Sequence, residues 1–108
     1  MSRVFFRVTR SNPPTALDFT SNFTIGRGLA NPTPERVHLW RGISVFDSEE
    51  LARKKARTVP QIGGYIVRLE VGDNSGIVSM PTFGKGHYTL WGAVEHIARC
   101  WVPPACDV

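Results

Sequence analysis

Two segments of the chain, residues 3–9 and 65–71, alternate with a period of two, which is the spacing of a β-strand and not of a helix. The first carries two phenylalanines and two valines across its two faces, with Arg7 between them. The second directs Arg68 and Glu70 to solvent and the alternate side chains to a core. Those expected core residues are Tyr65, Val67, Leu69 and Val71. Any fold of this chain must therefore contain a sheet.

Shorter elements complete the expected fold, and most are bounded by proline, glycine or a polar cap. Thr15 is expected to cap a short helix that runs to Phe23, and Thr33 precedes a helical turn that begins at Pro34. Asp47 or Ser48 is expected to cap a longer helix that ends before Pro60. The remaining expected elements are strands at 43–46, 77–80 and 99–102, a glycine-rich loop at 81–92 and a short helix at 93–97. The order predicts an α+β fold in which helices pack on a mixed or antiparallel sheet, and residues 1–108 form a single domain.

Composition is that of an ordinary globular protein, with 42% hydrophobic and 20% charged residues. No apolar run reaches the roughly 20 residues that a membrane-spanning helix needs. The first ten residues place arginines on both sides of a short apolar patch, which does not match the apolar region of a signal peptide. We therefore expect a cytoplasmic protein with no membrane partner.

A net charge of +4 raises the question of an acidic partner such as nucleic acid. The densest basic run, residues 52–57, falls within the helix expected from Ser48, with alanines on its apolar side. Glutamates in the first turn and basic residues after it complement the helix dipole, and Glu49 with Arg53 forms a favourable i,i+4 pair. A solvated helix face explains the run, so the charge pattern does not favour a nucleic-acid partner.

The two cysteines lie close together near the end of the chain, at Cys100 and Cys106. With His87 and His96 they would make a metal set whose spacing fits structural zinc sites poorly, so no metal is expected. Cys100 lies in an apolar stretch where a thiol usually acts as a small core residue. A disulfide between the two is disfavoured by the expected cytoplasmic location.

Three places combine residue types that can bind or react, and each also has a purely structural interpretation. Arg7 either lies on a solvated face or holds a guanidinium on a rigid strand, ready for a phosphate or carboxylate. Arg41 and Ser44 flank Gly42, which either eases a bend or lets a ligand approach the backbone. Residues 84–92 either cover the open end of the sheet or form the edge of a ligand site. The candidate side chains in that last segment are His87, Tyr88 and Trp91.

Four stretches carry a resemblance to a known superfamily. They read FRVTRSNPPT at 6–15, LWRGISVFDSEELARKKA at 39–56, YIVRLEV at 65–71 and GHYTLWG at 86–92. Together they resemble small bacterial domains of the ADP-ribosyltransferase-like superfamily, including the RES-type toxin domains. The resemblance spans nearly the whole chain and implies a split sheet with a cleft that holds NAD as substrate.

The resemblance also implies roles for individual residues. Arg7 would bind the phosphates or ribose of the nucleotide, Ser44 would position the nicotinamide ribose, and Arg41 would be a further cofactor-binding residue. Aromatic stacking on the nicotinamide would come from Phe46 or Tyr88, with Trp91 nearby. Glu95 or His87 would act at the reacting sugar. The chain lacks an STS triplet and an E-x-E pair, both of which occur in this superfamily.

The leading hypothesis is thus a toxin-like ADP-ribosyltransferase or NAD glycohydrolase. Its partners would be NAD or a related nucleotide, together with a protein target or a protein inhibitor. The alternative is a non-catalytic α+β interaction module whose basic surface and 84–91 segment bind a protein or nucleic-acid partner.

Overall fold

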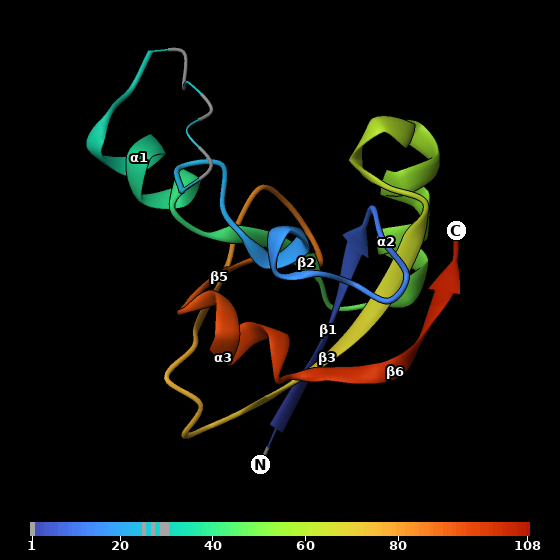
Figure 1. Ribbon diagram of the computed structural model, residues 1–108. Helices are drawn as coiled ribbons and strands as arrows, with labels where there is room; N and C mark the ends of the chain where they lie inside the picture. Colours follow the sequence, from blue (N-terminus) through green and yellow to red (C-terminus); the bar gives the residue numbers. More distant parts are fainter. Residues whose placement is uncertain (1, 25, 27, 29–30) are drawn as a thin grey trace.

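The computed structural model describes residues 2–24, 26, 28 and 31–108, and within these ranges six strands form one antiparallel sheet (Figure 1). The strand order is β4-β5-β2-β1-β3-β6. The strands are β1 (Ser2–Thr9), β2 (Ile43–Phe46), β3 (Tyr65–Gly72), β4 (Val78–Pro81), β5 (His87–Trp91) and β6 (Trp101–Asp107). The helices are α1 (Pro34–Trp40), α2 (Glu49–Thr58) and α3 (Val94–Ala98), with short 3-10 turns η1 (Ala16–Phe19) and η2 (Pro60–Ile62). The α+β prediction is confirmed at this level, and the sheet is antiparallel.

The centre of the sheet is buried on both faces. On one face, η1 and α3 contribute Phe19 and Ile97 to a core that includes Phe5, Leu69 and Leu90. On the other face, α2 packs its two alanines against β1 and β3. That second cluster consists of Val8, Ala52, Ala56 and Ile66. Burial on both faces explains why β1 and β3 carry apolar side chains at successive positions.

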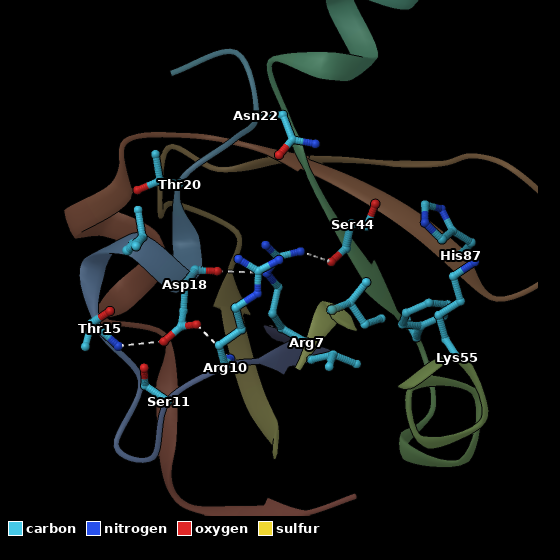
Figure 2. A pocket seen from close by; sticks show the side chains of 14 residues that line it. Arg7, Arg10, Ser11, Thr15, Asp18, Thr20, Asn22, Ser44, Lys55 and His87 are labelled. Atoms are coloured by element: carbon cyan, nitrogen blue, oxygen red, sulfur yellow. Dashed lines mark hydrogen bonds between the residues drawn. The ribbon is translucent and has the colours of Figure 1, made fainter. Parts of the chain in front are cut away.

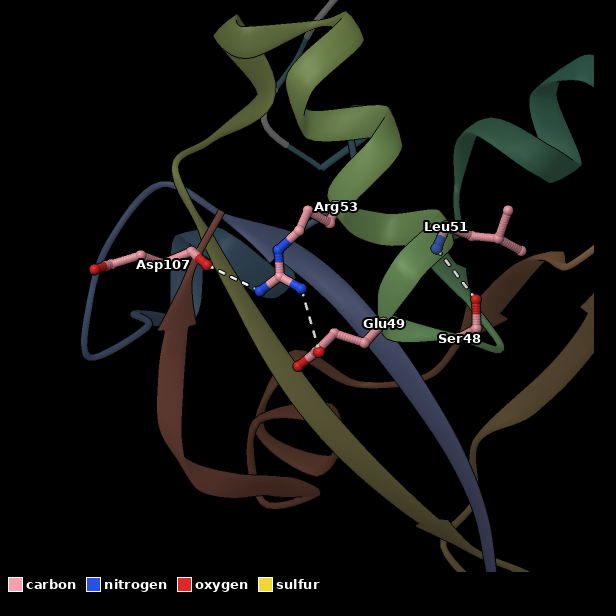
Figure 3. A network of polar contacts seen from close by, with 5 residues as sticks. All are labelled: Ser48, Glu49, Leu51, Arg53 and Asp107. Atoms are coloured by element: carbon pink, nitrogen blue, oxygen red, sulfur yellow. Dashed lines mark hydrogen bonds and ion pairs between the residues drawn. The ribbon is translucent and has the colours of Figure 1, made fainter.

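The predicted caps of two helices are present. The side chain of Thr33 accepts a hydrogen bond from the backbone N–H of Arg36 at 3.2 Å, with Pro34 in the first turn. Of the two candidate caps of α2, Ser48 is the one used, and its hydroxyl accepts from the N–H of Leu51 at 3.1 Å (Figure 3). Each cap satisfies a main-chain donor that the first turn of a helix leaves unpaired.

Helix α2 is also tied to the end of the chain. Arg53 pairs with Glu49 at 3.2 Å, as the i,i+4 spacing predicts, and its other terminal nitrogen donates to the carbonyl of Asp107 at 3.0 Å (Figure 3). Arg53 therefore departs from the solvated helix face predicted for the basic run, because it is half-buried and joins α2 to β6.

Three element predictions need correction. The segment predicted as a loop at 81–92 contains strand β5, because Tyr88 and Leu90 alternate onto the core face, and only the turn before β5 uses the glycines. The helix predicted to reach Phe23 ends at Phe19, and the side chains of Leu17 and Phe23 are exposed. The last strand begins at Trp101 and continues past two prolines, which an edge strand tolerates because its outer N–H groups need no partner.

The sheet opens between two of its central strands. Strand β1 pairs with β3 along its full length, from Ser2–Gly72 to Thr9–Tyr65. Across the described ranges, β1 pairs with β2 at one position, where Phe6 faces Phe46. Beyond that pair the two strands diverge, and the backbone groups that face the gap need hydrogen-bond partners from elsewhere.

Candidate functional site

A pocket of about 410 Å³ lies where β1 and β2 diverge (Figure 2). Its walls come from the end of β1, the segment that leads into η1, strand β2, helix α2 and the start of β5. The charged and titratable side chains that line it are Arg7, Arg10, Asp18, Lys55 and His87. Its apolar surface comes from Val8, Leu17, Phe46 and Ile62. A volume of this size lies within the range of small-molecule sites.

Arg7 bridges the opening in the sheet. Its Nε donates to the carbonyl of Asp18 at 3.0 Å, and Nη1 donates to the carbonyl of Ser44 at 2.7 Å. A side chain thus supplies hydrogen bonds to the backbone where the β1–β2 ladder has ended. Within the described residues no carboxylate forms an ion pair with Arg7, and Nη2 has no hydrogen-bond partner.

The environment of Arg7 disfavours its charge. The guanidinium lines the pocket, and desolvation lowers the pKa of Arg7 to about 10. The negative charge of Asp18 opposes this effect, and the positive charge of Arg10 adds to it. Because this cation stays charged at neutral pH and forms no ion pair with a carboxylate of the described residues, binding of an anion next to it is strongly favoured.

Asp18 organises the wall around Arg7 and does not pair with it. One carboxylate oxygen accepts from the backbone N–H of Arg10, and the other accepts from that of Thr15, both at 2.9 Å (Figure 2). These bonds fold the segment between β1 and η1 back on itself. They place the side chain of Arg10 on the pocket wall while the carbonyl of Asp18 holds Arg7.

His87 is oriented by the turn before β5. Its Nδ1 lies 3.1 Å from the carbonyl of Thr82 and 3.0 Å from the Thr82 hydroxyl, which is 2.8 Å from that of Thr89. Because a carbonyl can only accept, we assign the proton to Nδ1, which leaves Nε2 as an acceptor when the ring is neutral. Nε2 has no hydrogen-bond partner among the described residues.

Burial lowers the pKa of His87, and Lys55 lowers it further, while the hydrogen bond to the Thr82 carbonyl acts in the opposite direction. The imidazole is therefore neutral at pH 7 in the empty pocket. Phe46 and Phe83 contact its ring edge-on, with centroids 5.2 and 5.3 Å away. These contacts fix the plane of the ring as well as its tautomer.

The structure brings four of the sequence-derived candidates to this one pocket. They are Arg7, Ser44, Phe46 and His87. Ser44 is exposed at the pocket wall, between Arg7 and His87 in Figure 2. Gly42, two residues earlier, is required for a reason other than a ligand, since a Cβ there would collide with the side chain of Thr89 on β5.

The other four candidates do not line the pocket. The guanidinium of Arg41 lies over the ring of Phe23 at 4.5 Å. Tyr88 points to the opposite face of the sheet, where its ring packs on Phe5 with centroids 5.1 Å apart. Trp91 donates from Nε1 to a carbonyl of α1 at 2.7 Å. Glu95 is exposed on α3.

Three lining residues with charged side chains were not identified from the sequence: Arg10, Asp18 and Lys55. Lys55 had a readable signal, because it follows the buried Ala52 by three positions and so lies at the edge of the apolar face of α2. Arg10 and Asp18 had none, since their placement depends on how the segment after β1 folds back.

No family model matches the chain, and no similar protein was found among characterised proteins or solved structures. Among the helices of the described residues, none is long and apolar enough to cross a membrane.

Proposed function

We propose that this chain is an NAD-using domain of the ADP-ribosyltransferase or NAD glycohydrolase type, and that the pocket between β1 and β2 holds the dinucleotide. One observation carries the proposal. Arg7, Ser44, Phe46 and His87, which come from three strands, line the same pocket, together with the additional cations Arg10 and Lys55. A partly buried, desolvated guanidinium without a carboxylate ion-pair partner among the described residues is suited to the pyrophosphate of a nucleotide.

Each side chain has a role that follows from its contacts. The unused N–H groups of Arg7 bind the phosphates, while its two carbonyl bonds hold it in place. Phe46 offers an aromatic surface to a planar ring of the ligand. The hydroxyl of Ser44 hydrogen-bonds a ribose. Nε2 of His87 accepts a hydrogen bond from a ribose hydroxyl or from water.

The reaction would break the bond between ribose C1′ and the nicotinamide nitrogen, and the electron pair leaves with the nicotinamide. Water or another acceptor then forms a bond to C1′, and neutral His87 takes up the proton of that nucleophile. Glu95 lies outside the pocket, and Asp18, the lining carboxylate, is held by two backbone N–H groups. Stabilisation of positive charge on the sugar is therefore weaker than a free carboxylate would give, and we expect slow turnover.

Incubation with NAD tests this proposal through the nicotinamide that is released. We expect slow release by the native chain, a decrease of about 100-fold in the His87→Gln variant, and no change in Glu95→Gln. Glu95→Gln is the matched control because the residue is exposed and does not line the pocket. Absence of both nicotinamide release and NAD binding would contradict the proposal.

A second candidate is an interaction module, and one observation favours it. Val78 and Met80 on edge strand β4 are exposed, as is Phe83 in the following turn. An edge strand with apolar side chains is a surface on which another protein can pair. This candidate becomes the better explanation if NAD neither binds nor reacts.

A further inference from the structure

The basic side chains of the pocket are arranged as two pairs. Arg7 and Arg10 lie on the side of η1, where the charge of Arg10 acts on Arg7. Lys55 and His87 lie on the side of α2 and β5, where the charge of Lys55 acts on His87. Figure 2 shows Ser44 between the two pairs. An anion bound at one pair would therefore leave the other without a counter-charge.

The charges of the pocket do not match those of NAD. In the described residues, three cations and one carboxylate line the pocket, which leaves two positive charges uncompensated. NAD combines a doubly negative pyrophosphate with a cationic nicotinamide ring, so it brings one net negative charge. The negative charge of the pyrophosphate compensates the positive charge at Arg7. Lys55, on the other side of the pocket, then faces no anionic group of NAD.

From this arrangement, we infer that the pocket has a second anion subsite at Lys55 and His87, and that its ligand is a dinucleotide with an anionic group apart from the pyrophosphate. This inference rests on the proposed function. Two dinucleotides have the required chemistry. NADP carries a phosphate on its adenosine ribose, and the nicotinic-acid form of NAD carries a carboxylate on its pyridine ring.

The geometry at His87 supports this subsite independently of the charge balance. Nδ1 is held by Thr82, so a second proton can enter only at Nε2, which has no partner among the described residues. Protonation there would give the subsite a second donor next to Lys55. Asp47, two residues before α2, is the carboxylate next to this turn: its N–H donates to the carbonyl of Gly86 at 2.9 Å, and its side chain lies beside Gly86.

Calorimetric titration of the native chain with NAD, NADP and the nicotinic-acid form of NAD tests the inference at low salt. We expect one of the two more anionic ligands to bind about tenfold more tightly than NAD, because one charge-assisted contact is added. Lys55→Met should abolish this preference, so that the three ligands bind the variant with similar affinity. Lys54→Met is the matched control, since Lys54 is the neighbouring lysine of α2, is exposed and does not line the pocket.

The outcomes separate the inference from the proposed function. If NAD binds and neither anionic ligand binds more tightly, the second subsite is refuted while the proposed function stands. The same conclusion follows if Lys55→Met weakens all three ligands equally. If none of the three binds, both the proposed function and the inference fail. Thermal melting of each variant shows whether it is folded before any titration is interpreted.

Discussion

The two long edges of strand β1 differ in how their hydrogen bonds are satisfied. Toward β3, backbone pairing continues from Ser2 to Thr9. Toward β2, the described residues pair at Phe6 alone, and the guanidinium of Arg7 then supplies a hydrogen bond to the carbonyl of Ser44. The closed edge forms the core of the fold. The open edge forms the pocket, because a side chain spans the gap that a ladder would have filled.

Two arginines illustrate the same difference. Arg53 joins α2 to the carbonyl of Asp107, and the carboxylate of Glu49 compensates its charge at 3.2 Å. Arg7 also donates to main-chain carbonyls, but it is desolvated and has no carboxylate partner among the described residues. The positive charge of Arg53 is balanced within the fold, whereas that of Arg7 is left for a ligand.

The largest effect is expected on the closed edge, where two leucines provide a matched test. Leu69 on β3 is fully buried, so Leu69→Ala should lower the free energy of unfolding by about 2–5 kcal/mol. Leu17 at the pocket rim is 67% exposed, so Leu17→Ala should change it by less than about 0.5 kcal/mol. Chemical denaturation measures the free energy of unfolding of both variants. Equal losses would refute the assignment of the closed edge to the core and of Leu17 to an exposed rim.

The next effect concerns binding at the open edge. Arg7→Met should weaken NAD binding by about 100-fold, because it removes the desolvated cation and its remaining donors. Arg53→Met should leave affinity unchanged and cost at most about 1 kcal/mol of stability, since Arg53 is a compensated residue near the surface. Calorimetry compares the two. Arg7→Lys, which keeps a charge but loses the fork, distinguishes lost binding from lost folding. Similar affinities for Arg7→Met and Arg53→Met would contradict the comparison.

The smallest effect is the pH dependence of binding. The pKa of His87 is lowered in the empty pocket, and an anion next to Nε2 would raise it, so binding takes up a proton. Affinity for NADP should therefore be several-fold higher at about pH 5.5 than at about pH 7.5. This gain is lost as the pH rises through the pKa that His87 has in the complex. His87→Gln should flatten this dependence. A pH profile that the substitution leaves unchanged would place the titrating group elsewhere.

Local patterns predicted much of the fold. The strands at 3–9 and 65–71 were recognisable from alternation, 43–46 was predicted as a short strand, and α2 was recognisable from Ser48 and the charge order around it. Strand β5 was missed because glycines before it resemble a loop, although Tyr88 and Leu90 have the spacing of a strand. The opening between β1 and β2 has no local signal, since strand pairing is decided by residues far apart in the chain.

The candidate site, like the fold, was predicted in part from local sequence features, and the rest depends on long-range contacts. Arg7, Ser44 and His87 stood out as unusual residue types, Phe46 was implied by the resemblance, and all four line the pocket. Arg41, Tyr88, Trp91 and Glu95 stood out equally, yet ring contacts, a main-chain hydrogen bond or an exposed helix place them elsewhere. Residue type identifies candidates, whereas the face of the sheet and the course of the segment after β1 decide which of them meet.

The most direct test of the open edge as the ligand site is an NMR titration of the isotope-labelled protein with NAD. We predict chemical-shift changes that saturate with NAD and centre on the backbone amides of Arg7, Ser44 and His87. The amides of β3 and β6 on the closed edge, for example those of Leu69 and Val102, should shift little. Changes centred on β4 and Phe83, or no saturable changes at all, would contradict the account.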